Sequence, residues 1–148
     1  MKHRILLVLV SMFVCFNLYS QNVQPTISDP KELALVEQQK EEVFKKLFKD
    51  PTNLSLLFKY ANLSIMVGDL EGAIGVFEQM LIYDSKLPRI RLELGVLYFR
   101  LGAYALANNY LKSVKEFNPP PEVEARVDQF LEAIVSACLL YTSPSPRD

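Results

Sequence analysis

Tryptophan is absent from this chain of 148 residues, and histidine and cysteine are nearly absent. The single histidine is His3 and the two cysteines are Cys15 and Cys138, so all three lie near an end of the chain. The long central part therefore has no thiol nucleophile, no imidazole base, no disulfide and no zinc site of the usual ligands. We predict that the protein is not an enzyme, with no catalytic, cofactor-binding or metal-binding residues.

Features that bind phosphate or nucleic acid are also missing. Gly68, Gly72 and Gly75 lie close together, but the lysine of a phosphate-binding loop does not accompany them. Outside residues 1–20 and 138–148, 13 basic side chains stand against 16 acidic ones, a net charge of −3. Nucleic-acid binding requires a basic surface, so we expect no nucleic-acid partner.

The first twenty residues have the pattern of an export signal. Lys2 and Arg4 precede an apolar run of fourteen residues from Ile5 to Leu18, interrupted only by Ser11 and Asn17, which is typical of a secretory signal peptide. The run is shorter than the ~20 residues that a membrane-spanning helix needs. We predict cleavage after Ser20, a flexible linker over residues 21–28 and a periplasmic location in the cell envelope. An uncleaved signal that anchors the chain is the alternative.

The last eleven residues, 138–148, resemble the translation of a transposase adapter used to prepare DNA sequencing libraries. Helical periodicity runs to Val135, and Pro144 and Pro146 are incompatible with its continuation. We therefore expect a last helix over residues 121–137, an adapter-derived tail over 138–148 and a native chain that continues beyond Ala137. A natural frayed tail is the alternative.

A first long helix should begin after Asp29, which is a good N-cap, with Pro30 at the first helical position and Glu32 placed to complete a capping box. Asp50 and Pro51 should end it. Its buried stripe is expected to comprise Leu33, Val36, Val43, Phe44, Leu47 and Phe48.

The central part of the chain matches itself at one constant shift without a gap. The matched pairs are Ala61 with Gly95, Leu63 with Leu97, Gly68 with Gly102, Ala73 with Ala107 and Phe77 with Leu111. This shift equals a repeat period of about 34 residues, which, with a helix, a turn and a helix in each unit, is the signature of one repeat family. The chain resembles this family, the tetratricopeptide repeats, over about residues 52–120.

The resemblance implies an all-α fold: a short α-solenoid of antiparallel helix pairs, within a domain over residues 29–137. The units cover about residues 54–87 and 88–121, and the helix over 121–137 caps the array. Small residues would allow close helix contacts, and the glycines would end the first helix of each pair. The register has four departures: Arg91 stands at the position of Leu57, Ser64 at that of Tyr98, Leu70 at that of Tyr104, and Ser85 where proline is usual.

In this family the first helix of each pair lines a concave groove. The resemblance therefore implies a peptide-binding groove formed by Ser55, Phe58, Asn62, Ile65, Met66, Arg89, Leu92, Val96, Phe99 and Arg100. Apolar side chains with arginines at the rim suit an extended or helical peptide with apolar anchors. Equally, the first helix or a missing part of the protein could cover several of these residues. Phe58 and Glu93 argue against a groove that grips a peptide C-terminus.

The signal peptide, the repeats and the segment over residues 87–131 together look like the periplasmic region of outer-membrane proteins related to the surface lipoprotein assembly modifiers. This resemblance implies an exported, non-catalytic protein–protein interaction module, the truncated periplasmic arm of a larger outer-membrane assembly or secretion factor. Its partner would be a protein or peptide client in the cell envelope, with membrane contact only through a missing downstream domain or an uncleaved signal. The alternative is an accessory repeat domain of an exported enzyme, such as a peptidase, whose catalytic part is missing.

Overall fold

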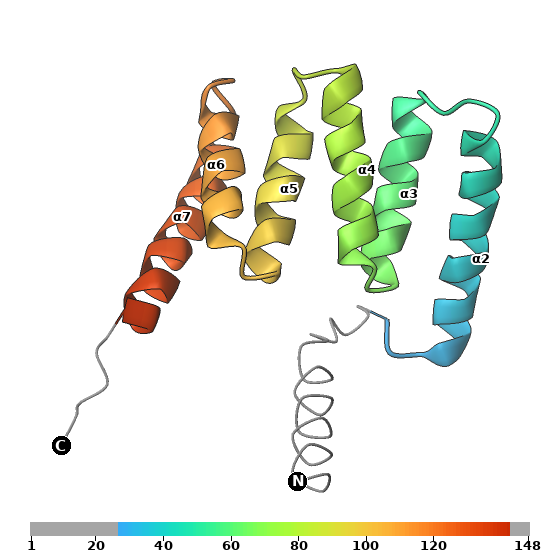
Figure 1. The fold of residues 1–148 in the computed structure, drawn as a ribbon, viewed down its shortest axis with the longest axis horizontal. Helices are drawn as coiled ribbons and strands as arrows, with labels where there is room; N and C mark the ends of the chain where they lie inside the picture. Colours follow the sequence, from blue (N-terminus) through green and yellow to red (C-terminus); the bar gives the residue numbers. More distant parts are fainter. Residues whose placement is uncertain (1–26, 143–148) are drawn as a thin grey trace, which may run out of the picture.

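The computed structural model describes residues 27–142, and every regular element in that range is an α-helix. The helices stand side by side in antiparallel order, as Figure 1 shows. They are α2 (Pro30–Leu47), α3 (Leu54–Met66), α4 (Leu70–Tyr83), α5 (Pro88–Arg100), α6 (Tyr104–Lys115) and α7 (Pro121–Thr142). The predicted all-α solenoid is confirmed. The signal peptide predicted over residues 1–20 lies outside the described residues.

Each helix packs against the next one in the sequence, and α7 also contacts α5. The contacts of α2 with α3 therefore correspond to those of α4 with α5 and of α6 with α7. This arrangement places α2 where the second helix of a preceding pair would lie, and α7 where the first helix of a third pair would lie (Figure 1). The described domain is thus built from two complete helix pairs with one additional helix at each end.

The start of α2 agrees with the expected cap but not with the expected capping box. The Asp29 side chain accepts a hydrogen bond from the Lys31 amide at 2.9 Å, and Pro30 is the first helical residue. The cap bond thus goes to the second helical residue rather than to Glu32. Ile27 is already buried in the core, so the predicted linker over residues 21–28 overlaps the folded domain.

The predicted buried stripe of α2 is too wide. Val36, Val43 and Leu47 are buried, whereas Phe44 is 49% exposed and Phe48 is 85% exposed. The reason is that α2 packs mainly against one neighbour, α3, so a helix face wide enough for two neighbours is only partly covered.

The predicted glycine caps are confirmed. Gly68 has φ of 86° and Gly102 has φ of 72°, and each follows the first helix of its pair. This left-handed conformation is costly for residues with a Cβ atom, which explains glycine at both turns. Asn118, at φ 48°, has the same role after α6, because asparagine tolerates this region better than most residues.

Small residues occupy the helix crossings. Ala61, Ala73 and Ala107 are fully buried. At Gly95, which aligns with Ala61, an added Cβ atom would lie 2.6 Å from Leu111 Cγ. The backbones of α5 and α6 therefore approach closely, as the repeat register predicts.

A polar contact joins α2 to the first complete pair. Asp69 caps α4 by accepting a hydrogen bond from the Gly72 amide at 3.0 Å, and it also accepts one from Lys40 of α2 at 2.8 Å. Burial opposes ionisation of Asp69, but the bonds from Lys40 and Gly72 outweigh it and lower the pKa of the carboxyl group. The ionised carboxylate therefore holds two helices together.

The last helix is longer than predicted. It continues to Thr142 instead of ending at residue 137, because the first proline after it is Pro144 and no glycine intervenes. Val127 and Ile134 are buried against α6, while Val135 is exposed. Among the helices within residues 27–142, none combines the length and apolar character that a membrane crossing requires.

Candidate peptide-binding groove

The ten residues predicted to form the groove lie on α3 and α5, five on each helix, and none of them is fully buried. Ser55, Arg89 and Arg100 are exposed, and the other seven are half-buried. The structure brings Ser55, Phe58 and Arg89 together around one cavity, whereas the remaining seven do not line it.

This cavity has a volume of about 390 Å³ and lies between the first turns of α3 and α5, next to α4. Met80 and Ile90 are buried in its wall, whereas Ser55 and Arg89 are exposed at its rim. Its lining is mostly apolar and consists of Leu54, Ser55, Phe58, Met80, Leu87, Pro88, Arg89 and Ile90. A concave apolar surface with a few polar groups is the usual form of a binding site in proteins. We refer to it below as the α3–α5 cavity.

Arg89 is positioned by an aromatic ring. Its guanidinium carbon lies 4.4 Å from the centre of the Phe58 ring, and Phe58 in turn packs against Phe77 at 5.9 Å between ring centres. Within the described residues, Arg89 takes part in no hydrogen bond or ion pair. Stacking holds the cation over the ring and leaves its five donors available to a ligand.

Part of the predicted groove is covered by the chain itself. Phe99 contacts Phe130 of α7 edge to face, at 5.4 Å between ring centres, and Leu92 packs in the same cluster. The covering element is therefore α7 rather than the first helix, α2. Asn62 is partly engaged as well, because its amide donates to the Phe58 carbonyl at 2.9 Å.

Sequence reasoning missed the contribution of α7 to this face. Phe130 touches Phe99, and Arg126 lies one helical turn before Phe130, on the same side of α7. The signal was available, because Arg126 and Phe130 follow Leu92 and Val96 by the same shift that relates α3 to α5. Five buried or half-buried wall residues were also missed, namely Leu54, Met80, Leu87, Pro88 and Ile90.

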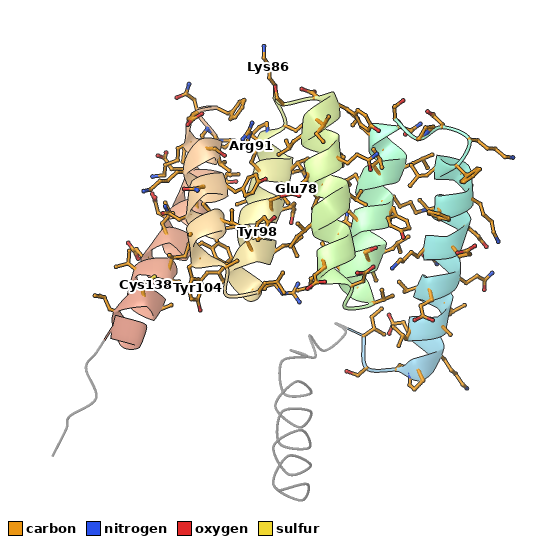
Figure 2. All side chains as sticks on the ribbon, in the orientation of Figure 1. Glu78, Lys86, Arg91, Tyr98, Tyr104 and Cys138 are labelled. Carbon is orange, nitrogen blue, oxygen red and sulfur yellow. The ribbon has the colours of Figure 1, made fainter. Side chains whose placement is uncertain are left out.

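A second polar cluster joins the two complete helix pairs (Figure 2). Glu78 of α4 accepts hydrogen bonds from the hydroxyl groups of Tyr98 on α5, at 2.7 Å, and Tyr110 on α6, at 3.2 Å. The two tyrosine rings stack with their centres 5.6 Å apart. Burial, followed by the hydrogen bond to Glu78, raises the pKa of Tyr98 to about 12, and burial with the nearby Glu78 charge raises the pKa of Tyr110. Both hydroxyl groups therefore stay protonated and act as structural donors.

Two departures from the repeat pattern contact one another. Arg91, at the position of Leu57, donates to the Ser85 carbonyl oxygen at 2.9 Å and to the Ser113 hydroxyl at 3.3 Å. Ser85 stands at the position of Pro119. The arginine therefore ties the loop between α4 and α5 to α6, where the family pattern would place an apolar side chain and a proline.

One repeat earlier, the positions that correspond to these two polar clusters are not bridged by hydrogen bonds, and most of them border a cavity. Phe44, Leu57, Ser64 and Val76 stand one repeat period before Glu78, Arg91, Tyr98 and Tyr110. These smaller or apolar residues make no equivalent bridge, and a cavity of about 440 Å³ lies between α2, α3 and α4. It is lined by Phe44, Leu47, Phe48, Pro51, Leu57, Tyr60, Val76 and Gln79. We refer to it below as the α2–α4 cavity.

The part of the chain that the structure describes contains no group of three or more histidine, cysteine, aspartate or glutamate residues arranged to hold a metal ion. The α3–α5 cavity combines a mostly apolar lining with one cation, Arg89, at its rim.

Comparison with known families agrees with the fold. Residues 64–127 match the tetratricopeptide repeat family, from the last turn of α3 into α7. No curated protein matches the chain. The described domain is therefore an all-α solenoid of the tetratricopeptide type, with a family match over residues 64–127.

Proposed function

We propose that this protein is a non-catalytic module that binds a protein or peptide client through the α3–α5 cavity. Tetratricopeptide repeats are in general protein–protein interaction modules. The observation that supports the proposal here is the apolar cavity of about 390 Å³, bordered by Ser55 and by a stacked arginine with free donors. An apolar side chain of a peptide could enter it while the peptide backbone stays near the polar rim.

We further propose that the protein acts in the cell envelope, as the periplasmic arm of a larger outer-membrane assembly or secretion factor. The support is the charged start and apolar run of residues 1–18, together with the resemblance over residues 87–131 described above. The gene sequence beyond Ala137 tests this proposal. Alternating strands that end in an aromatic residue would support an outer-membrane protein, whereas a metal-binding or nucleophile motif would contradict the proposal and indicate an enzyme.

Selection from a library of short random peptides tests the binding function. Peptides enriched on the wild-type protein should lose most of their affinity for Phe58→Ala, because this change removes one wall of the cavity. Phe48→Ala is the matched control, because Phe48 is 85% exposed and lines the other cavity. If no peptide is enriched, or if enriched peptides bind Phe58→Ala as well as wild type, the α3–α5 cavity is not the binding site.

A further inference from the structure

The groove carries positive charge although the whole chain does not. The formal net charge of the chain is −1. On the face formed by α3, α5 and α7, Arg89, Arg100 and Arg126 are all exposed, and the acidic side chains that we assign to this face are Glu93 and Glu122, which lies one helical turn before Arg126. A cationic surface on a slightly acidic protein selects partners of opposite charge.

These arginines are not neutralised by the domain itself. Within residues 27–142, none of the three takes part in an ion pair or a hydrogen bond. Lys40, Lys45 and Lys115, by contrast, each pair with a carboxylate elsewhere on the surface. The positive charge of the groove is therefore available to a ligand.

The ring of Phe58 orients the first of these cations. A guanidinium group that stacks on a ring is held in one plane, and its edge can form two parallel hydrogen bonds with a carboxylate. Because Arg89 also borders the α3–α5 cavity, a carboxylate bound there would lie next to whatever apolar side chain fills the cavity. An apolar anchor and an adjacent carboxylate are thus recognised together.

We propose that the groove binds an acidic peptide segment in which a large apolar side chain fills the α3–α5 cavity and a neighbouring Asp or Glu side chain pairs with Arg89. This inference rests on the proposed binding function and names the chemistry of its ligand. Arg89 and Arg100 are about 16 Å apart along α5. An extended peptide spans this distance with about five residues, so a second acidic residue about five positions along the peptide reaches Arg100.

The acidic group is a side chain rather than a peptide C-terminus. Members of this family that grip a peptide C-terminus use a lysine inside the groove, and Phe58 stands at the position of that lysine. Amidation of the peptide C-terminus should therefore leave the affinity unchanged.

Fluorescence anisotropy with the peptides enriched in the library selection tests this inference on the complete chain. The enriched peptides should contain Asp or Glu next to a large apolar residue. Replacing those acidic residues by Lys should weaken binding at least about tenfold, the scale expected for loss of a well-formed charge pair. Arg89→Gln should weaken binding of the acidic peptide similarly, and Lys86→Gln, an exposed cation on the loop after α4, is the matched control.

The outcomes separate the two proposals. If the enriched peptides are neutral or basic but still depend on Phe58, the groove binds peptides and the acidic preference is wrong. The same conclusion follows if Arg89→Gln binds the acidic peptide as tightly as the wild-type protein does. It also follows if amidation of the peptide C-terminus weakens binding while replacement of the acidic side chains by Lys does not. If no peptide is enriched, both proposals fail.

Discussion

The close approach of α5 and α6 makes Gly95 the most informative position for a stability test. A Cβ atom at this position would lie 2.6 Å from Leu111 Cγ and 2.8 Å from Leu111 Cδ2. Replacing a helix-interior glycine by alanine normally stabilises a protein by about 1 kcal/mol. In Gly95→Ala this gain is opposed by overpacking, which typically costs about 1–3 kcal/mol. We therefore expect the free energy of unfolding to be unchanged or lowered by up to about 2 kcal/mol.

Gly75→Ala provides the matched control, because Gly75 is also inside a helix, α4, but apart from its chain neighbours and the nearby backbone of α4 no atom lies within 4 Å of the position of its added Cβ. This variant should gain up to about 1 kcal/mol. Urea denaturation of the two variants measures the difference, which should be about 1–3 kcal/mol in favour of Gly75→Ala. Equal stabilisation of both variants would show that α5 and α6 are not in close contact at Gly95, and the repeat register would lose its main support.

Further predictions concern the same register, the open cavity and the chain ends. Ala107→Leu should destabilise the protein by about 1–3 kcal/mol, because Ala107 is fully buried at a helix crossing. The control Asn109→Leu, at an exposed position, should change the free energy of unfolding by less than about 0.5 kcal/mol. Similar losses in both variants would contradict a close helix crossing at Ala107. Val76→Phe should fill part of the α2–α4 cavity and raise the free energy of unfolding by about 0.5–2 kcal/mol, and a loss in urea denaturation would mean that the space is not available. Mass spectrometry of protein expressed in a bacterium should find a mature chain that begins at Gln21, and a full-length membrane-retained species would overturn the predicted cleavage. A chain that ends at Ala137 should melt at the same temperature as the full chain, and a drop of several degrees would show that the tail packs.

The repeat fold could be predicted because it depends on short-range spacing. Gly68 and Gly102 determine where two turns occur, and Ala73 and Ala107 mark the close contacts, so a single shift of one repeat period predicts both helix pairs. Which apolar side chains are buried at the ends of the array was less predictable. Whether Phe44 and Phe48 are buried depends on how many neighbours α2 has, and a helical stripe in the sequence carries no such information.

The candidate site was predicted only in part, for a similar reason. The register places Phe58 and Arg89 on the first helices of successive pairs, but their stacking depends on the side-chain conformations of both residues. The contact between Arg91 and the Ser85 carbonyl was not predictable from the two separate departures, because each looks unfavourable when considered alone. Compensation of this kind depends on packing between elements rather than on local propensity.

The location of bound peptide is the most direct test of a binding site in the α3–α5 cavity. Backbone amide NMR spectra of the protein, recorded with increasing amounts of an enriched peptide, measure which residues respond. We expect the largest shift changes at Ser55, Phe58 and Arg89, around the α3–α5 cavity. Changes centred instead on Phe48 and Val76 would place the peptide in the α2–α4 cavity and contradict the proposed site.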